Sequence, residues 1–195
     1  MRFAQVTYPS STVISLQEAK DHLRVTSDTE DALILDCIKS ATSFVEQYTG
    51  ITLLSGTYKA YLDSCEALVY DMIELWMFPI TAVSSIQYID TNGATQTLSS
   101  SNYSLDITDS PARIWATSIP QQKANTLNTF IVNFSCGYTN TDLIPFELKG
   151  WVKILTGFFY ETRQAEYTGN TGNVTNEIKY NYQRALDKFR KDNLV

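Results

Sequence analysis

The apolar residues of this 195-residue chain change their spacing twice along the sequence. Near both ends they recur every three or four positions, which is the spacing of one face of an α-helix. Between about residues 52 and 138 they lie in short, partly alternating runs rich in β-branched and aromatic residues, which is typical of β-strands. The pattern therefore predicts helices at both ends of the chain and a β-rich segment between them.

The N-terminal part is predicted to contain an extended arm, residues 1–14, and two helices. Ser15-Leu16-Gln17-Glu18 has the form of a capping box, so a short helix is expected from Ser15 to about Arg24. A longer helix is expected to start within residues 27–31, where acidic residues suit the positive end of its dipole. Gly50 is its predicted stop.

The middle of the chain is predicted to form short strands. They cover residues 57–62, 83–89, 94–98, 103–107, 113–115 and 129–134. Asp90-Thr91-Asn92-Gly93 lies between two of them and is a hairpin turn signal. A calcium loop would need more acidic ligands at set spacings and a closing glutamate, so the hairpin is favoured.

A second helical part begins near Asp142, which can cap, and Pro145, which suits a first helical turn. The helix is expected to run to about Arg163, and its dense apolar set, which includes Phe146, predicts a central place in the core. A Gly- and Asn-rich loop, 166–174, precedes a last helix, 175–192. The predicted fold class is α+β, a helical bundle built from both chain ends (1–51 and 142–195) with an inserted antiparallel β module (52–141).

Composition excludes several classes of protein. A hydrophobic content of 44% makes disorder implausible, and a net charge of −6 argues against a dedicated DNA-binding domain. Three widely spaced cysteines fit buried thiols in a reducing cytosol better than a disulfide framework. We expect neither a signal peptide nor a membrane-spanning segment.

Candidate chemistry is sparse, and the sequence predicts no catalytic, metal or cofactor site. One histidine, His22, leaves zinc sites and His-based hydrolases short of residues. Asp28, Glu30 and Asp31 could form a metal cluster, but a position at the N-terminus of a helix explains these acids with fewer assumptions. Glu161 and Glu166 could be glycosidase carboxylates, which is weak support for an enzyme.

Charge is unevenly distributed. The last predicted helix holds five basic and three acidic residues, whereas residues 1–174 hold ten basic and eighteen acidic ones. The helix is either a solvated element whose cations suit its dipole or a docking element for an acidic partner or nucleic-acid phosphates.

Aromatic residues crowd the β module, namely Tyr58, Tyr61, Tyr70, Trp76, Tyr88, Tyr103 and Trp115. Strand propensity combined with a subunit interface explains them well. A carbohydrate-binding platform of a virion or surface protein is the alternative function.

The order of the segments resembles the head–tail connector (adaptor) proteins of tailed bacteriophages, over nearly the whole chain. The similar stretches are Val13-Ile14-Ser15-Leu16-Gln17-Glu18-Ala19-Lys20-Asp21-His22-Leu23-Arg24-Val25, Val45-Glu46-Gln47-Tyr48-Thr49-Gly50, Phe78-Pro79-Ile80, Val83-Ser84-Ser85-Ile86-Gln87-Tyr88-Ile89-Asp90, Phe134-Ser135-Cys136-Gly137-Tyr138 and Phe159-Tyr160-Glu161-Thr162-Arg163. The chain departs from shorter members of the family in the size of its insert.

The resemblance implies a structural protein of the virion neck, made in the host bacterial cytoplasm, with no enzymatic activity and no cofactor. It implies a homo-oligomeric ring, usually twelve-fold in relatives, which lies below the portal protein and carries a stopper or tail-completion protein. Double-stranded DNA would pass through the ring without sequence-specific binding, and no membrane is involved. The expected portal-docking residues on the last helix are Arg184, Lys188, Phe189, Arg190 and Lys191.

Overall fold

The computed structural model describes residues 1–63, 72–118, 120–162 and 184–190. The chain forms two compact units, each assembled from two separate stretches of sequence. Residues 1–9 and 55–138 form the β unit, and residues 10–54 and 139–195 form the helical unit. Both sheets of the β unit are antiparallel, so the fold is α+β.

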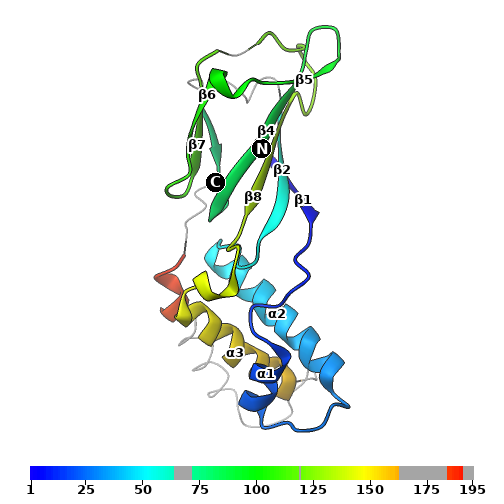
Figure 1. The fold of residues 1–195 in the computed structure, drawn as a ribbon, viewed down its shortest axis with the longest axis vertical. Helices are drawn as coiled ribbons and strands as arrows, with labels where there is room; N and C mark the ends of the chain where they lie inside the picture. Colours follow the sequence, from blue (N-terminus) through cyan, green and yellow to red (C-terminus); the bar gives the residue numbers. More distant parts are fainter. Residues whose placement is uncertain (64–71, 119, 163–183, 191–195) are drawn as a thin grey trace. The chain divides into compact units, whose positions relative to one another are not determined.

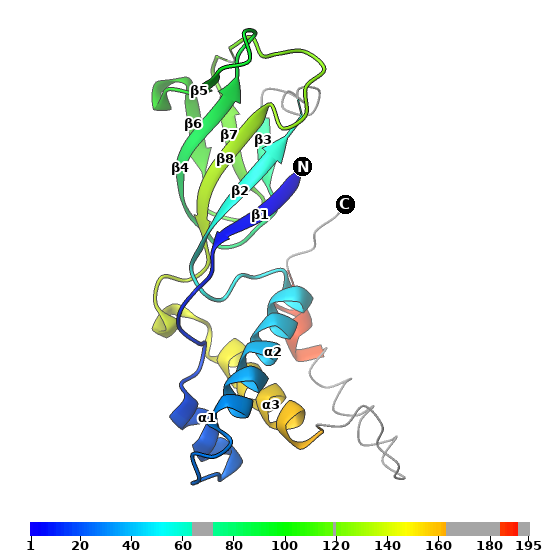
Figure 2. The same cartoon turned by 90° about the vertical axis from the view of Figure 1, so that its right-hand side faces the viewer.

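The β unit contains two sheets, which lie one behind the other in Figure 2. The five-stranded sheet has the order β1 (Arg2–Thr7), β2 (Gly56–Leu62), β8 (Phe130–Cys136), β4 (Ile80–Ile89) and β5 (Thr95–Thr97). The three-stranded sheet has the order β3 (Met72–Leu75), β7 (Ala112–Ala116) and β6 (Tyr103–Asp106). Because every neighbouring pair is antiparallel, no crossover helix is needed within this unit.

The core of the β unit lies between the sheets. In β8, Phe130, Val132 and Phe134 are buried, while the residues between them are only half-buried. Ile114 of β7 and Leu75 of β3 belong to the same buried cluster. The period of two along β8 therefore separates a face that packs on the second sheet from a face that points away from it.

The N-terminal arm differs from the sequence-based expectation, which assigned it to the helical part. Residues 2–7 form β1 and pair with β2, and Arg2 lies opposite Tyr61. The ring of Phe3 meets that of Phe134 edge to face, with the centroids 6.2 Å apart. Residues 1–9 of the arm therefore belong to the β unit, because β1 pairs with β2, which lies some fifty residues further along the chain.

The predicted hairpin joins β4 to β5. The Asp90 carboxylate accepts hydrogen bonds from the backbone N–H groups of Asn92 and Ala94, both at 2.9 Å. The Ala94 bond is the leading cause of a lowered Asp90 pKa. Gly93 has φ 86°, which suits glycine. The acid is therefore used to close the turn.

The helical unit is built from α1 (Leu16–Leu23), α2 (Asp31–Thr49) and α3 (Phe146–Glu161). The long helices α2 and α3 pack along each other, and α1 contacts both (Figure 1). Their facing residues are fully or almost fully buried, as for Ile34, Ile38 and Val45 of α2 and Val152 and Leu155 of α3. Two helices remote in sequence thus share one apolar core.

The capping box predicted at the start of α1 is present. The backbone N–H of Glu18 donates to Ser15 Oγ at 3.1 Å, and the Glu18 carboxylate accepts from the Ser15 backbone N–H at 2.8 Å. These two bonds satisfy N–H groups that the first helical turn leaves without partners.

The predicted acidic cap of α2 has a different role. The Lys20 side chain is only 7% exposed, and its Nζ donates to Asp28 at 2.6 Å and to Asp31 at 2.8 Å. These bonds, with that to Asp28 foremost, raise the pKa of Lys20. The N-cap position of α2 is Glu30, which makes no side-chain capping bond. Asp28 and Asp31 therefore join α1 to α2 through Lys20.

The start of α3 also differs from the prediction. Asp142 does not cap this helix, and its N-cap position is Pro145.

Residues 45–50, one of the stretches that resemble the connector family, form the end of α2. Gly50 has φ 70°, and its N–H donates to the carbonyl of Glu46. The Glu46 carboxylate accepts from the Leu53 N–H at 2.7 Å, which holds the chain that leaves the helix. Burial of Glu46 raises its pKa despite these backbone bonds.

Two glycines offer a matched test of helix energetics. Gly50→Ala is expected to lower the free energy of unfolding by about 1 kcal/mol, because the left-handed conformation penalises a Cβ. Gly150→Ala is expected to raise it by about 0.5–1 kcal/mol, because Gly150 lies inside α3 and a Cβ there meets no atom within 4 Å. Urea unfolding followed by helical circular dichroism measures both, and equal effects at the two sites would contradict the assignment.

The buried carboxyl of Glu46 makes stability depend on pH. Since its pKa is raised, its protonated form favours folding, and this contribution is present at low pH and lost as pH rises through the folded-state pKa. Glu46→Gln keeps the acceptor for Leu53 without a charge, so its Tm relative to the unmodified protein should be highest at pH 7 and fall toward pH 4.5.

Glu46→Ala is the control, because it leaves the Leu53 N–H without its acceptor at a cost of about 1–3 kcal/mol. Thermal unfolding across this pH range measures all three proteins. A Glu46→Gln difference that does not change with pH would contradict the prediction.

Candidate interaction surfaces

The described end of the chain is anchored to the helical unit. Residues 184–187 form a helical turn, and Leu186 within it is fully buried. The Tyr48 hydroxyl donates to Asp187 at 2.6 Å, and Lys188 Nζ donates to Glu147 at 3.0 Å. One apolar anchor and two polar bonds therefore fix residues 184–190 against the long helices.

Four of the five predicted docking residues lie in this anchored segment. Arg184, Lys188 and Arg190 are exposed, and Lys188 Nζ lies 4.7 Å from the centroid of the Phe189 ring. Lys191 and the remainder of the predicted last helix lie outside the described residues. The Lys188–Glu147 bond also contributes to a lowered Glu147 pKa, after the larger effect of the backbone N–H of Glu147. The structure thus brings basic and aromatic groups together on a fixed support.

An apolar ridge, formed by Leu143, Phe146 and Ile154, contains the large apolar side chains that are exposed in the described part of the helical unit. Their exposed fractions are 61%, 83% and 44%. The sequence prediction placed Phe146 in the core, and this is wrong. Residues 146, 150 and 154 follow one face of α3, whereas the buried Leu148, Val152 and Leu155 follow another. Density of apolar residues did not reveal that two faces of the helix are apolar.

An aromatic groove lies between α2 and α3. It has a volume of about 450 Å³ and is lined by Phe44, Phe159, Lys39, Ser40, Ser43 and Gln47. The serine and lysine positions are exposed, while the two aromatic rings are half-buried. The groove therefore has an apolar floor and a polar, open rim.

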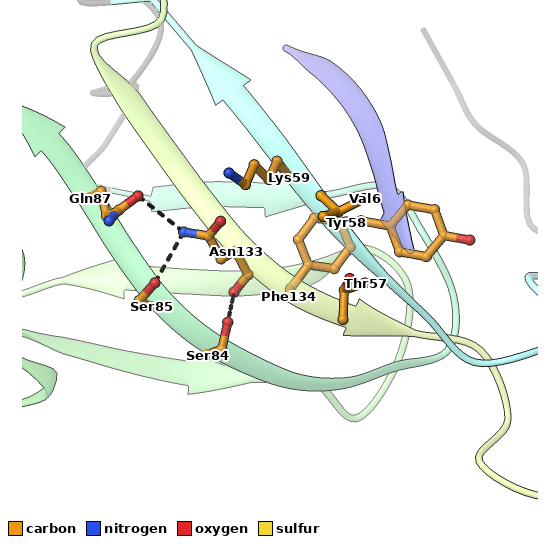
Figure 3. A pocket seen from close by; sticks show the side chains of 9 residues that line it. All are labelled: Val6, Thr57, Tyr58, Lys59, Ser84, Ser85, Gln87, Asn133 and Phe134. Carbon is orange, nitrogen blue, oxygen red and sulfur yellow. Dashed lines mark hydrogen bonds between the residues drawn. The ribbon is translucent and has the colours of Figure 1, made fainter. Parts of the chain in front are cut away.

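The β unit carries a shallow hollow of about 380 Å³ on its five-stranded sheet, shown in Figure 3. Asn133 Nδ2 donates to Ser85 Oγ at 3.0 Å and to Gln87 Oε1 at 3.3 Å. Ser84 Oγ donates to the Asn133 carbonyl at 2.9 Å. These polar groups satisfy one another across the strands, so they stabilise the sheet.

Three of the aromatics predicted for the β module, Tyr58, Tyr88 and Tyr103, lie in its core or pack against it. Tyr58 is buried and stacks on Phe134, and Tyr88 and Tyr103 pack against the core. Trp115 is 53% exposed, but it belongs to the other sheet. Tyr70 lies outside the described residues. This distribution gives the carbohydrate-binding alternative no support.

The residues considered as catalytic candidates, His22, Glu161 and Glu166, are not brought together in the described part of the chain. The exposed His22 of α1 lies over α3, where its Nε2 would be 3.6 Å from a Cβ at Gly157. Glu161 ends α3, and Glu166 is outside the described residues. The described residues contain no group of three or more metal-ligating side chains, and none of their helices could span a membrane.

Comparison with known families identifies the chain. The sequence model of the phage gp6-like head-tail connector proteins matches residues 13–110, about half of the chain. The chain belongs to this family. The family match confirms the prediction of a structural connector at the junction of head and tail, with no enzymatic role. No curated protein matches the chain.

Solved particle structures contain chains with the same fold. One is in the neck of an empty gene transfer agent (GTA) particle computed with C6 symmetry, with 22% identity and a TM-score of 0.79. Others are in the virion of a native GTA particle, with 21% identity and a TM-score of 0.77, and in the neck of a native particle computed with C12 symmetry, with 19% and 0.74. Each match covers 100% of this connector and 98% of the other chain.

Loss of the buried anchor should release the C-terminal segment. Leu186→Asp is expected to speed hydrogen exchange of the Phe189 and Arg190 amides, which donate to the Leu186 and Asp187 carbonyls, by about 30-fold or more. Lys188→Met removes an exposed ion pair and the contact of Lys188 Nζ with the Phe189 ring but keeps the apolar anchor, so it should change exchange by less than about fivefold. Equal effects of the two variants would contradict an apolar anchor.

Proposed function

We propose that this connector forms a closed ring at the head–tail junction, around the channel through which DNA passes. The proposal rests on the family match and on a fold shared with chains in necks computed with C6 and C12 symmetry. A ring of twelve copies is consistent with both of these symmetries. The ring would lie below the portal protein and present its other side to a stopper or tail-completion protein.

In this proposal the helical unit, built from residues 10–54 and 139–195, forms the body of the ring. Its two stretches share one core through α2 and α3, which gives each subunit a rigid block. The β unit would lie outward or toward the tail and help to join neighbours. Its exposed edge strand β1 and the exposed Trp115 are surfaces available for such contacts.

The C-terminal segment is the proposed portal-docking element, with Arg184, Lys188, Phe189, Arg190 and Lys191 as contact residues. Its support is the charge distribution, because a segment with a net positive charge ends a chain with a net charge of −6. Opposite charges on two proteins steer their association and fix its register. The anchoring by Leu186 presents these residues from a fixed support.

DNA would pass through the ring without being held. Neutralisation of phosphates by lysine and arginine supplies most non-specific DNA affinity. A subunit with 21 acidic and 15 basic residues has little basic surface to spare for this purpose. An acidic or neutral channel lining repels phosphates, so the duplex can slide.

Charge reversal tests the docking proposal. Arg184→Glu combined with Arg190→Glu should weaken binding of the full chain to the portal ring by about tenfold or more, with the largest loss at low salt. Lys123→Glu reverses an exposed charge in the β unit and serves as the matched control. Portal binding measured by interferometry at several salt concentrations checks the prediction, and unchanged affinity in the double variant would refute it.

A further inference from the structure

The apolar ridge and the aromatic groove lie on nearly opposite sides of α3. An α-helix turns by about 100° per residue, so Ile154 and Phe159, five positions apart, point about 140° away from each other. The same angle separates Phe146 from Phe159, which is thirteen positions further along. The helical unit therefore carries a protruding apolar surface on one side and a recessed one on another.

A closed ring requires this kind of pair. Head-to-tail contacts use two different surfaces on every subunit, and each must fit the other. We propose that the ridge of one copy seats in the groove of the next copy, with Phe146 inserted between α2 and α3 of its neighbour. The inference rests on the proposed ring and names the surfaces that close it.

Size and polarity support a second copy as the occupant. The groove is open to solvent and has a volume of about 450 Å³, so a phenylalanine side chain from another subunit can reach its aromatic floor. Its floor is formed by Phe44 and Phe159, and aromatic pairs gain energy beyond simple burial. Phe146, at 83% exposure, is the side chain that gains most from burial there.

Charge at the two rims is complementary. Asp142 stands next to the ridge with 83% of its side chain exposed, and Lys39 stands at the groove with 67% exposed. Within one chain Asp142 faces Lys149 only at 3.9 Å, and Lys39 faces Asp36 at 3.2 Å. The Lys39–Asp36 pair is exposed and the Asp142–Lys149 pair is long, so both are weak and these charges can be shared across a subunit contact.

Gly150 supplies a further reason. It lies between Phe146 and Ile154 on the ridge, and a Cβ there would meet no atom within 4 Å. A glycine inside an exposed helix costs about 0.5–1 kcal/mol relative to alanine, and the surrounding structure offers no compensation. The absence of a side chain at Gly150 would allow a neighbouring subunit to approach the backbone of α3 closely.

Cross-linking tests the geometry directly. Phe146→Cys and Ser43→Cys are introduced together into the full chain, in a Cys65→Ser background, because Cys37 and Cys136 are buried. The protein is assembled with its portal ring and treated with a short bismaleimide. We expect covalent species larger than dimers, because each copy links to two neighbours. Each single-cysteine variant should assemble but give no covalently linked species.

The pattern of products separates the alternatives. Dimers formed by Phe146→Cys alone would mean that ridge meets ridge, and this would overturn the proposal. Absence of cross-links in the double variant, with a ring of normal mass, would overturn it as well. The ring itself is checked by the native mass of the unmodified chain with portal, so its absence there would show that the proposed function fails.

Two blocking variants give an independent readout. Phe146→Asp removes the ridge side chain, and Ser43→Trp fills the groove from an exposed position; each should weaken subunit association by about 30-fold or more. Leu127→Asp, at a position 68% exposed in the β unit, is the matched control and should assemble normally. Native mass of the assembly measures all three, and normal rings from both blocking variants would exclude this contact while leaving the ring intact.

Discussion

The helical unit depends on the antiparallel pairing of β2 with β8. The chain leaves the helices near residue 54 and returns near residue 139, and the N–H of Ser55 donates to the Tyr138 carbonyl at 3.1 Å. The pairing of Gly56 with Cys136 continues this contact into the sheet. The ends of an insert more than eighty residues long are thus held together, which shortens the effective loop between α2 and α3 and lowers the entropy cost of closing it. Gly56 is required at this point, because a Cβ there would lie 2.9 Å from the Thr7 carbonyl of the arm.

Local features of the fold were accessible from the sequence, and contacts between distant segments were not. The capping box at Ser15 and the stop at Gly50 are decided within a few residues, so short motifs predict them. The pairing of the arm with β2 and the binding of Asp28 by Lys20 depend on where remote segments lie. The four-residue strand β3 is too short for alternation to mark it.

The candidate surfaces also depend on contacts between distant segments and not on local motifs. A family resemblance indicated which end of the chain to examine, but neither surface beside α3 follows from local periodicity. Phe146 and Val152 are equally apolar, and only the direction in which each leaves the helix decides that the first is 83% exposed and the second is buried. The groove depends on Phe44 and Phe159, which come together only when α2 packs on α3.

The scarcity of charge and of titratable groups fits a protein whose work is assembly. A subunit that must bind neighbours on two sides cannot cover its surface with hydrated charges, because each would have to be desolvated or paired at an interface. Only 18% of residues are charged, and the ridge residues Leu143, Phe146 and Ile154 expose apolar side chains. In the proposed docking of the C-terminal segment, its anchoring through Leu186 would serve the same end, because a segment already fixed in place loses less conformational entropy when a partner binds. The physical demands of the proposed ring therefore favour rigid supports, shaped apolar surfaces and a small number of well-placed charges.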